Sequence, residues 1–146
     1  MKIAFGADHA GFNLKKDLIE WVKETENQVL DFGTYSEEPV DYPDYAFPAA
    51  EAVAAGIADY GIIICGTGIG VSITANKVQG IRAANCFTPE MAETARQHNN
   101  ANVLTLGARL TDLETAKKIV TAFIDGEFQG GRHMIRVEKI HFLTGN

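Results

Sequence analysis

Cysteine and tryptophan are scarce in this sequence of 146 residues, which contains two cysteines, one tryptophan and four prolines. Cys65 and Cys86 lie too far apart for the close cysteine pairs of a zinc site, and two cysteines are too few for a disulfide framework. A chain of this length buries enough surface to fold without such cross-links. The two thiols therefore suit a reducing compartment, and we expect the protein to be cytoplasmic.

Long apolar runs are also missing, because no stretch approaches the ~20 apolar residues that cross a bilayer. Residues 1–5 begin a strand-like run directly and lack the features of a secretion signal. Basic residues are the minority charge, since 13 Lys and Arg stand against 19 Asp and Glu, for a formal net charge of -6. Phosphate backbones repel such a chain, so we expect neither a nucleic acid nor a membrane as partner.

The remaining composition is that of a globular protein, with 46% hydrophobic and 22% charged residues. At about 100 to 200 residues per domain, the length predicts a single domain spanning 1–146. Short apolar runs rich in β-branched residues alternate with stretches of helical period. This order predicts an α/β fold, a Rossmann-like doubly wound sheet of five parallel strands flanked by helices. The predicted strands are residues 3–7, 27–32, 59–65, 81–87 and 102–107.

Three local patterns refine this prediction. Residues 59–65 are almost continuously apolar, which is typical of a central strand covered on both faces. Thr88 is expected to cap the helix after the fourth strand, and Thr-Asp-Leu-Glu at 111–114 predicts a capping box for the next one. The last helix, from about 132 to 142, has no strand after it, so we expect it to pack on a partner subunit.

Ligands of such a sheet bind beyond the carboxyl ends of the strands. The run Gly-Thr-Gly-Ile-Gly at 66–70 follows the central strand and allows a backbone to approach an anion closely. Its third glycine comes one position too early for the dinucleotide fingerprint, and no acid follows about 20 residues later, which disfavours a nicotinamide cofactor. A tight turn without a ligand is the alternative. We expect six polar side chains to converge on one rim of the sheet: Asp8, His9, Cys65, His98, Asn99 and Arg109.

These candidates also have purely structural explanations. Cys65 precedes a helix whose dipole would stabilise a thiolate and make it a base or nucleophile, but a small buried hydrophobe is an equally simple interpretation. Cys86 is assigned to packing. Asp8 suits the N-cap of the first helix, and His9 and His98 suit helix ends, where they interact with nearby backbone groups.

Arginines provide the cations that an anionic ligand would need in an acidic protein. Arg132 and Arg136 are four residues apart, so they project from one face of a helix. With Arg109 they offer planar donors suited to a phosphate, although ion pairs with surface acids would explain them equally well.

Several motifs occur in one order: Gly-Ala-Asp-His-Ala-Gly at 6–11, Asp-Tyr-Pro at 41–43, Cys-Gly-Thr-Gly-Ile-Gly at 65–70, Arg-Gln-His-Asn at 96–99, and Gly-Arg-His at 131–133 with Arg136. In this combination the chain resembles the sugar-phosphate isomerase family that includes the galactose-6-phosphate isomerase subunits. The resemblance runs from residue 2 to about 140. It implies an aldose–ketose isomerase that interconverts ribose 5-phosphate and ribulose 5-phosphate through a cis-enediolate, without a metal or an organic cofactor.

The resemblance also implies roles for individual residues. Cys65 would be the base that moves the proton between C2 and C1. His98 would donate a proton during ring opening, and Asp8 would hold a sugar hydroxyl or the ring oxygen. The anion hole for the enediolate would consist of the Thr67 hydroxyl and the backbone of Gly66, Thr67, Gly68, Ile69 and Gly70.

Phosphate and sugar contacts are implied in the same way. The phosphate would lie among His9, Arg109, Arg132 and Arg136, and Tyr42 and Asn99 would contact the sugar. The site would be shared between the subunits of a homodimer, whose further pairing into a tetramer the sequence leaves open.

Other functions compete with this one. An isomerase of a six-carbon sugar phosphate, allose 6-phosphate or galactose 6-phosphate, would need only a slightly deeper pocket. A non-catalytic, flavodoxin-like module could hold a nucleotide or a flavin over the glycine turn. A redox-sensing thiol protein is a third alternative, although Cys65 has no resolving cysteine close in sequence.

Overall fold

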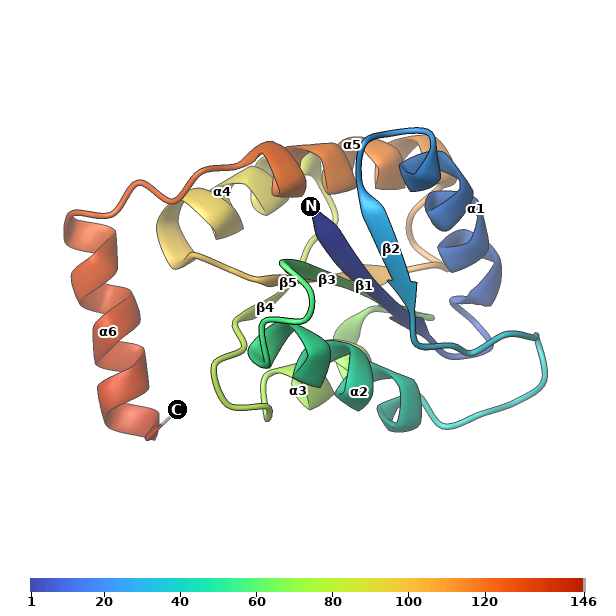
Figure 1. Ribbon diagram of the computed structural model, residues 1–146, viewed down its shortest axis with the longest axis horizontal. Coiled ribbons are helices and arrows are strands. Elements are labelled where there is room, and N and C mark those ends of the chain that lie inside the picture. The colour runs from blue at the N-terminus through green and yellow to red at the C-terminus, as the bar shows by residue number, and fades with distance from the viewer. Residues whose placement is uncertain (146) are drawn as a thin grey trace.

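The computed structural model describes residues 1–145, in which helices and strands alternate along the chain (Figure 1). This alternation confirms the predicted α/β fold. The elements in order are β1 (Lys2–Ala7), α1 (Phe12–Lys23), β2 (Gln28–Asp31), α2 (Pro43–Ala54), β3 (Tyr60–Cys65), α3 (Ile69–Ala75), β4 (Ala83–Asn85), α4 (Pro89–Asn99), β5 (Val103–Gly107), α5 (Leu113–Asp125) and α6 (Arg132–Thr144).

The five strands form one parallel sheet in the order β2-β1-β3-β5-β4. β3 lies in the middle, as its apolar sequence predicts. Within β3, Ile62 and Ile64 face one side of the sheet and Ile63 faces the other, because successive side chains of a strand alternate. Both sides are covered by helices, so residues 61–65 of β3 are all buried, which explains the nearly continuous apolar sequence.

Two apolar layers hold the helices against the sheet. α1, α4 and α5 cover one face, where Leu18, Ile119 and Phe123 are buried. α2 and α3 cover the other face with smaller side chains, including Ala49 and Val71. Figure 1 shows these two helical layers above and below the strands, with the sheet between them.

One strand is shorter than the sequence predicts, whereas the helix that follows it begins as predicted. β4 is an edge strand that pairs with β5 only over Ala83–Asn85, because the N–H of Arg82 is bound by the Asn102 side chain instead of the ladder. Thr88 caps α4 as predicted and accepts the Met91 N–H at 3.2 Å.

The capping box predicted at 111–114 is not formed as expected, because the N-cap of α5 is Asp112 and not Thr111. The Asp112 carboxylate accepts the Thr115 N–H at 2.9 Å, and this bond lowers the pKa of Asp112. Thr111 precedes the cap, and its hydroxyl is buried without a hydrogen-bond partner.

The final helix, α6, stands apart from the α/β body and contacts it mainly through α4 (Figure 1). Its buried side chains are His133 and Val137. Large apolar side chains remain exposed on it, including Ile135, Phe142 and Leu143. None of the helices within residues 1–145 has the length and apolar character that a bilayer crossing needs.

Candidate active site

The carboxyl ends of β1, β3 and β5 bring three chain segments together. Ala7 pairs with Ile64, and Cys65 pairs with Gly107, so the turns that follow these strands share one edge of the sheet. The Asp8 N–H donates to the Ile64 carbonyl at 3.2 Å, and the Arg109 N–H donates to the Gly66 carbonyl at 3.0 Å. Asp8, Cys65 and Arg109 therefore lie at the same rim, as the topology predicts.

The Cys65 thiol is 5% exposed and points at the glycine turn. Its sulfur accepts the Gly68 N–H at 3.2 Å. Gly68 has φ +77°, and the same turn leads directly into α3. The sulfur therefore lies beside a backbone donor in the turn before α3, which distinguishes this thiol from one surrounded by apolar side chains.

Cys86 provides the contrast, because it ends up in the core without such a donor. It is 1% exposed, and burial raises the pKa of its thiol to about 11. Its sulfur lies 3.7 Å from the Ala84 carbonyl oxygen, an acceptor rather than a donor. The assignment of Cys86 to packing is thus confirmed.

Side chains pack closely against the turn at 66–70, which explains its glycines. A β-carbon on Gly66 would lie 2.9 Å from the Arg109 guanidinium, and one on Gly70 would lie 2.7 Å from the Tyr42 ring. Arg109 and Tyr42 therefore flank the turn from two sides. The Thr67 hydroxyl accepts the N–H of Ile69 at 3.3 Å, so its own proton points elsewhere and can be donated.

Asp8 and His9 follow β1, which lies on the other side of β3 from β5 and Arg109. The Asp8 carboxylate accepts the Gly11 N–H at 3.0 Å, but the N-cap of α1 is Gly11 itself, so Asp8 closes the turn before the helix. The Nδ1 atom of His9 lies 3.1 Å from the Val40 nitrogen and 3.3 Å from the Val40 carbonyl oxygen. In the tautomer that accepts the Val40 N–H, the imidazole proton lies on Nε2, which can donate to an anion.

Four predicted site residues lie elsewhere in the same chain. α4 ends at Asn99, just before β5 begins at Val103, so His98 and Asn99 lie at the amino edge of the sheet. β5 has five residues at ~3.3 Å each, which places about 15 Å between this edge and Cys65. One chain therefore does not bring all the predicted side chains to one rim. The helix after a parallel strand runs back across the sheet, and its C-terminal end cannot reach the carboxyl edge.

These distant residues form a cluster of their own where α4 meets α6. The rings of His98 and His133 are stacked, with centroids 4.2 Å apart and planes 4° from parallel. Burial, followed by the charges of His98, Arg132 and Arg136, lowers the pKa of His133. The cluster is cationic and carries no acid in these contacts, so it offers an anion donors without a competing carboxylate.

Sequence reasoning missed two contributors to the rim. A β-carbon on Gly68 would lie 2.3 Å from the Asn85 amide oxygen, so Asn85 backs the glycine turn. The predicted strand 81–87 placed Asn85 inside the strand, whereas β4 ends at this residue. With the correct end, the rule that ligands bind beyond the carboxyl ends of strands would have indicated Asn85. Val40 acts through its backbone N–H, which no side-chain pattern can reveal. Among residues 1–145, no group of three His, Cys, Asp or Glu residues is placed to hold a metal ion.

Comparison with known proteins identifies the family. The sequence model of the Ribose/Galactose Isomerase family matches residues 3–140. The chain belongs to this family.

Among similar ribose/galactose isomerases, ribose-5-phosphate isomerase B of Escherichia coli (strain K12) is 52% identical over 95% of this chain and 93% of its own length. D-erythrulose-4-phosphate isomerase of Pectobacterium atrosepticum is 44% identical over 97% and 94%. The structure of Clostridium thermocellum ribose-5-phosphate isomerase B matches with a TM-score of 0.98 and 51% identity, covering 99% of this chain and 98% of that one. These matches confirm the family resemblance and the fold.

Proposed function

We propose that the protein interconverts ribose 5-phosphate and ribulose 5-phosphate by moving a proton between C2 and C1. The observation that carries this proposal is the Cys65 sulfur, held at 3.2 Å from the Gly68 N–H at the mouth of the glycine turn. A base and hydrogen-bond donors then lie side by side, as enolisation next to a carbonyl requires. The match to ribose-5-phosphate isomerase B over nearly the whole chain supports the substrate.

In the proposed mechanism, the Cys65 thiolate removes the proton from C2 and the thiol returns it to C1, while the hydroxyl proton of O2 is transferred to O1. Negative charge develops on the substrate oxygens in the enediolate. Backbone N–H groups of residues 66–70 and the Thr67 hydroxyl would stabilise that charge, and one such donor contributes about 3 to 4 kcal/mol to the transition state. Asp8, at the same rim, would hold a sugar hydroxyl or the ring oxygen.

The phosphate and the closed sugar ring need groups that one chain does not supply at this rim. His9, Arg109 and Tyr42 are present there, whereas His98, Asn99, Arg132 and Arg136 lie at the other end of the molecule. A homodimer in which the partner supplies these four residues completes the site. The exposed apolar side chains of α6 support such an interface, because isolated helices rarely leave so much apolar surface uncovered. The two free thiols favour a cytoplasmic location for the single-domain subunit.

The test is a coupled assay of ketose formation by the wild type and by Cys65→Ala. Loss of a general base should lower kcat by about 10²- to 10⁴-fold without unfolding the protein. Cys86→Ala is the matched control, since it removes a second buried thiol from a strand end and should retain turnover. Unchanged turnover in Cys65→Ala would show that another group is the base.

Substrate length is tested in the same assay with allose 6-phosphate beside ribose 5-phosphate. The family contains a relative named for a four-carbon substrate, so the fold itself accommodates different sugars. A higher kcat/KM for the pentose supports the proposal, and a higher value for the hexose would assign the protein to six-carbon sugar phosphates. Flavin or nucleotide absorbance in the purified protein, with no turnover of either sugar, would support a binding module.

A further inference from the structure

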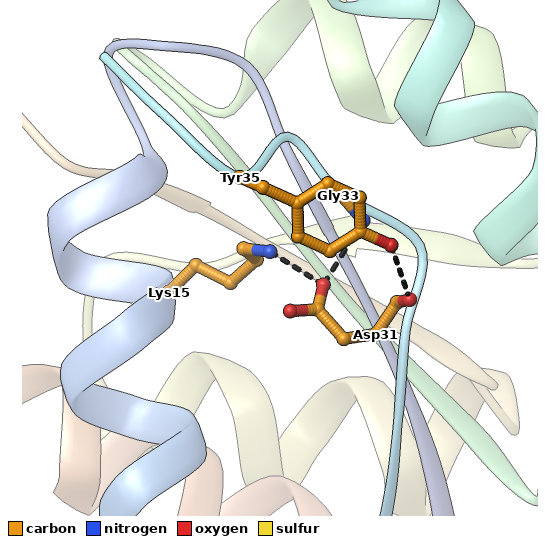
Figure 2. A network of polar contacts seen from close by, with 4 residues as sticks. All are labelled: Lys15, Asp31, Gly33 and Tyr35. Carbon is orange, nitrogen blue, oxygen red and sulfur yellow. Dashed lines mark hydrogen bonds and ion pairs between the residues drawn. The ribbon is translucent and has the colours of Figure 1, made fainter.

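A lysine is buried beneath the loop that leads to the site. Lys15 on α1 is 1% exposed, and its ammonium group forms an ion pair with Asp31, the last residue of β2. The same nitrogen lies 5.1 Å from the centroid of the Tyr35 ring. Figure 2 shows the lysine reaching from the helix to the carboxylate, with the tyrosine above them.

Asp31 joins this cation to the start of the connection between β2 and α2, which we define as the front loop, residues 32–42. The carboxylate oxygen that pairs with Lys15 also accepts the Gly33 N–H at 2.9 Å. The Asp31 carbonyl accepts the Tyr35 hydroxyl at 2.9 Å. The carboxylate of the ion pair thereby holds the point at which the front loop leaves β2, and the main-chain carbonyl of the same residue holds Tyr35 in the first turn (Figure 2).

The front loop in turn contacts the residues that precede and form the site. The Ala7 N–H donates to the Gly33 carbonyl and the Thr34 N–H donates to the Ala7 carbonyl, both at 2.7 Å. Asp8 and His9 follow Ala7 directly. Further along, the Val40 N–H binds His9, and the loop ends at Tyr42, the N-cap of α2.

A charge at position 15 is unnecessary for packing alone. Burying an ammonium ion costs free energy that an apolar side chain of similar size would not, and what the ion pair supplies in return is a fixed geometry. Asp31 is partly exposed, with 31% of its side chain accessible, whereas Lys15 is enclosed. Asp31 can therefore be solvated by water in part, whereas the buried cation relies on the carboxylate and on the Tyr35 ring.

We propose that Lys15 is a positioning residue: acting through Asp31, it holds the front loop so that His9 and Tyr42 face the substrate. This inference rests on the proposed function, because it assigns Lys15 to the binding of the sugar phosphate. It makes the ion pair a determinant of substrate affinity and leaves the proton transfer at Cys65 unaffected.

The test compares Lys15→Met and Asp31→Asn with the wild type. Both variants should raise KM for ribose 5-phosphate about tenfold, with kcat within about twofold. Amide hydrogen exchange of residues 33–41 should accelerate in both, while β3 and β5 stay protected. Lys117→Met is the control, because it removes the lysine of the Glu114 ion pair on the surface of α5 and should change neither quantity.

Merely structural damage predicts a different pattern, in which kcat falls with the folded fraction and KM stays constant. That pattern, or unchanged exchange of the front loop, would overturn the proposal. Lys15→Arg keeps the charge, so its KM should lie between the KM of the wild type and that of Lys15→Met. A KM in Lys15→Arg as high as in Lys15→Met would also contradict the proposal. If Lys15→Met does not fold, Asp31→Asn alone carries the test, since it removes the charge of the partner from a side chain that is 31% exposed.

Failure of the proposed function is separable from failure of this inference. A wild type without isomerase activity on either sugar overturns the substrate assignment, and with it the part of the inference that concerns affinity. Hydrogen exchange then decides the remaining part, since accelerated exchange confined to residues 33–41 in Lys15→Met still shows that Lys15 holds the loop. Unchanged exchange would overturn that part as well.

Discussion

Single residues at the carboxyl rim owe their chemistry to their immediate neighbours. Cys65 and Cys86 are both buried thiols near strand ends, but only the sulfur of Cys65 faces a backbone donor, the Gly68 N–H. This donor exists because Gly68 adopts φ +77°, a conformation that side chains disfavour. The glycine is thus part of the environment of the thiol.

Gly68→Ala tests this dependence at the residue scale. The new methyl group would lie 2.3 Å from the Asn85 amide oxygen and 2.9 Å from the Leu106 carbonyl carbon, so the turn must shift. Gly80→Ala is a matched control with φ +82° and nothing within 4 Å of the added carbon. We expect Gly80→Ala to cost about 1 kcal/mol of stability. Gly68→Ala should cost about 2 kcal/mol more and should abolish turnover, as measured by urea unfolding and the coupled assay.

Equal stability losses in Gly68→Ala and Gly80→Ala would mean that the rim tolerates the added carbon. Retained activity in Gly68→Ala would show that the bond from the turn to Cys65 is dispensable. Both measurements use one protein concentration, because the stability of an oligomer depends on concentration.

At the scale of elements, the sequence predicted the alternation of strands and helices and the central position of β3, because periodicity records which faces are buried. It overextended β4, whose flanking residue Arg82 hydrogen-bonds to a side chain instead of the ladder. It also placed His98 at the wrong edge. Local sequence shows that a histidine ends a helix, whereas the direction in which that helix crosses the sheet follows only from the assembled topology.

The junction of α4 and α6 carries a prediction about pH. The pKa of His133 lies below its ordinary value of 6.5, because burial and then the charges of His98, Arg132 and Arg136 oppose protonation. The unfolded chain therefore binds this proton more readily than the folded chain does. The contribution of neutral His133 to the free energy of unfolding is fully present above about pH 6.5 and is lost as the pH falls below that value. His133→Gln should reduce the decline in thermal midpoint on acidification. A difference between wild type and variant that does not change with pH would contradict the effect.

For the whole molecule, the two clusters at opposite ends are the feature that demands an explanation. The net charge of -6 repels a sugar phosphate, yet Arg132 and Arg136 lie on α6, which contacts the α/β body mainly through α4. The two guanidinium groups attract an anion that binds beside them, but the rim that carries the proposed base of the same chain lies at the far edge of the sheet. Assembly with a second copy would resolve this separation, since a two-fold interface that brings one rim beside the cluster of the other subunit brings the second rim beside the first cluster as well.

Mixing two inactive variants tests the shared site directly. Cys65→Ala lacks the proposed base and Arg136→Ala lacks a proposed phosphate ligand, so a homodimer of either variant should be impaired at both of its sites. After unfolding and refolding together in equal amounts, about half of the dimers are mixed. A mixed dimer with shared sites has one site that lacks both residues and one that lacks neither, so about one quarter of the wild-type activity should return. If each chain carried its own complete site, every site would retain one defect and mixing would restore nothing.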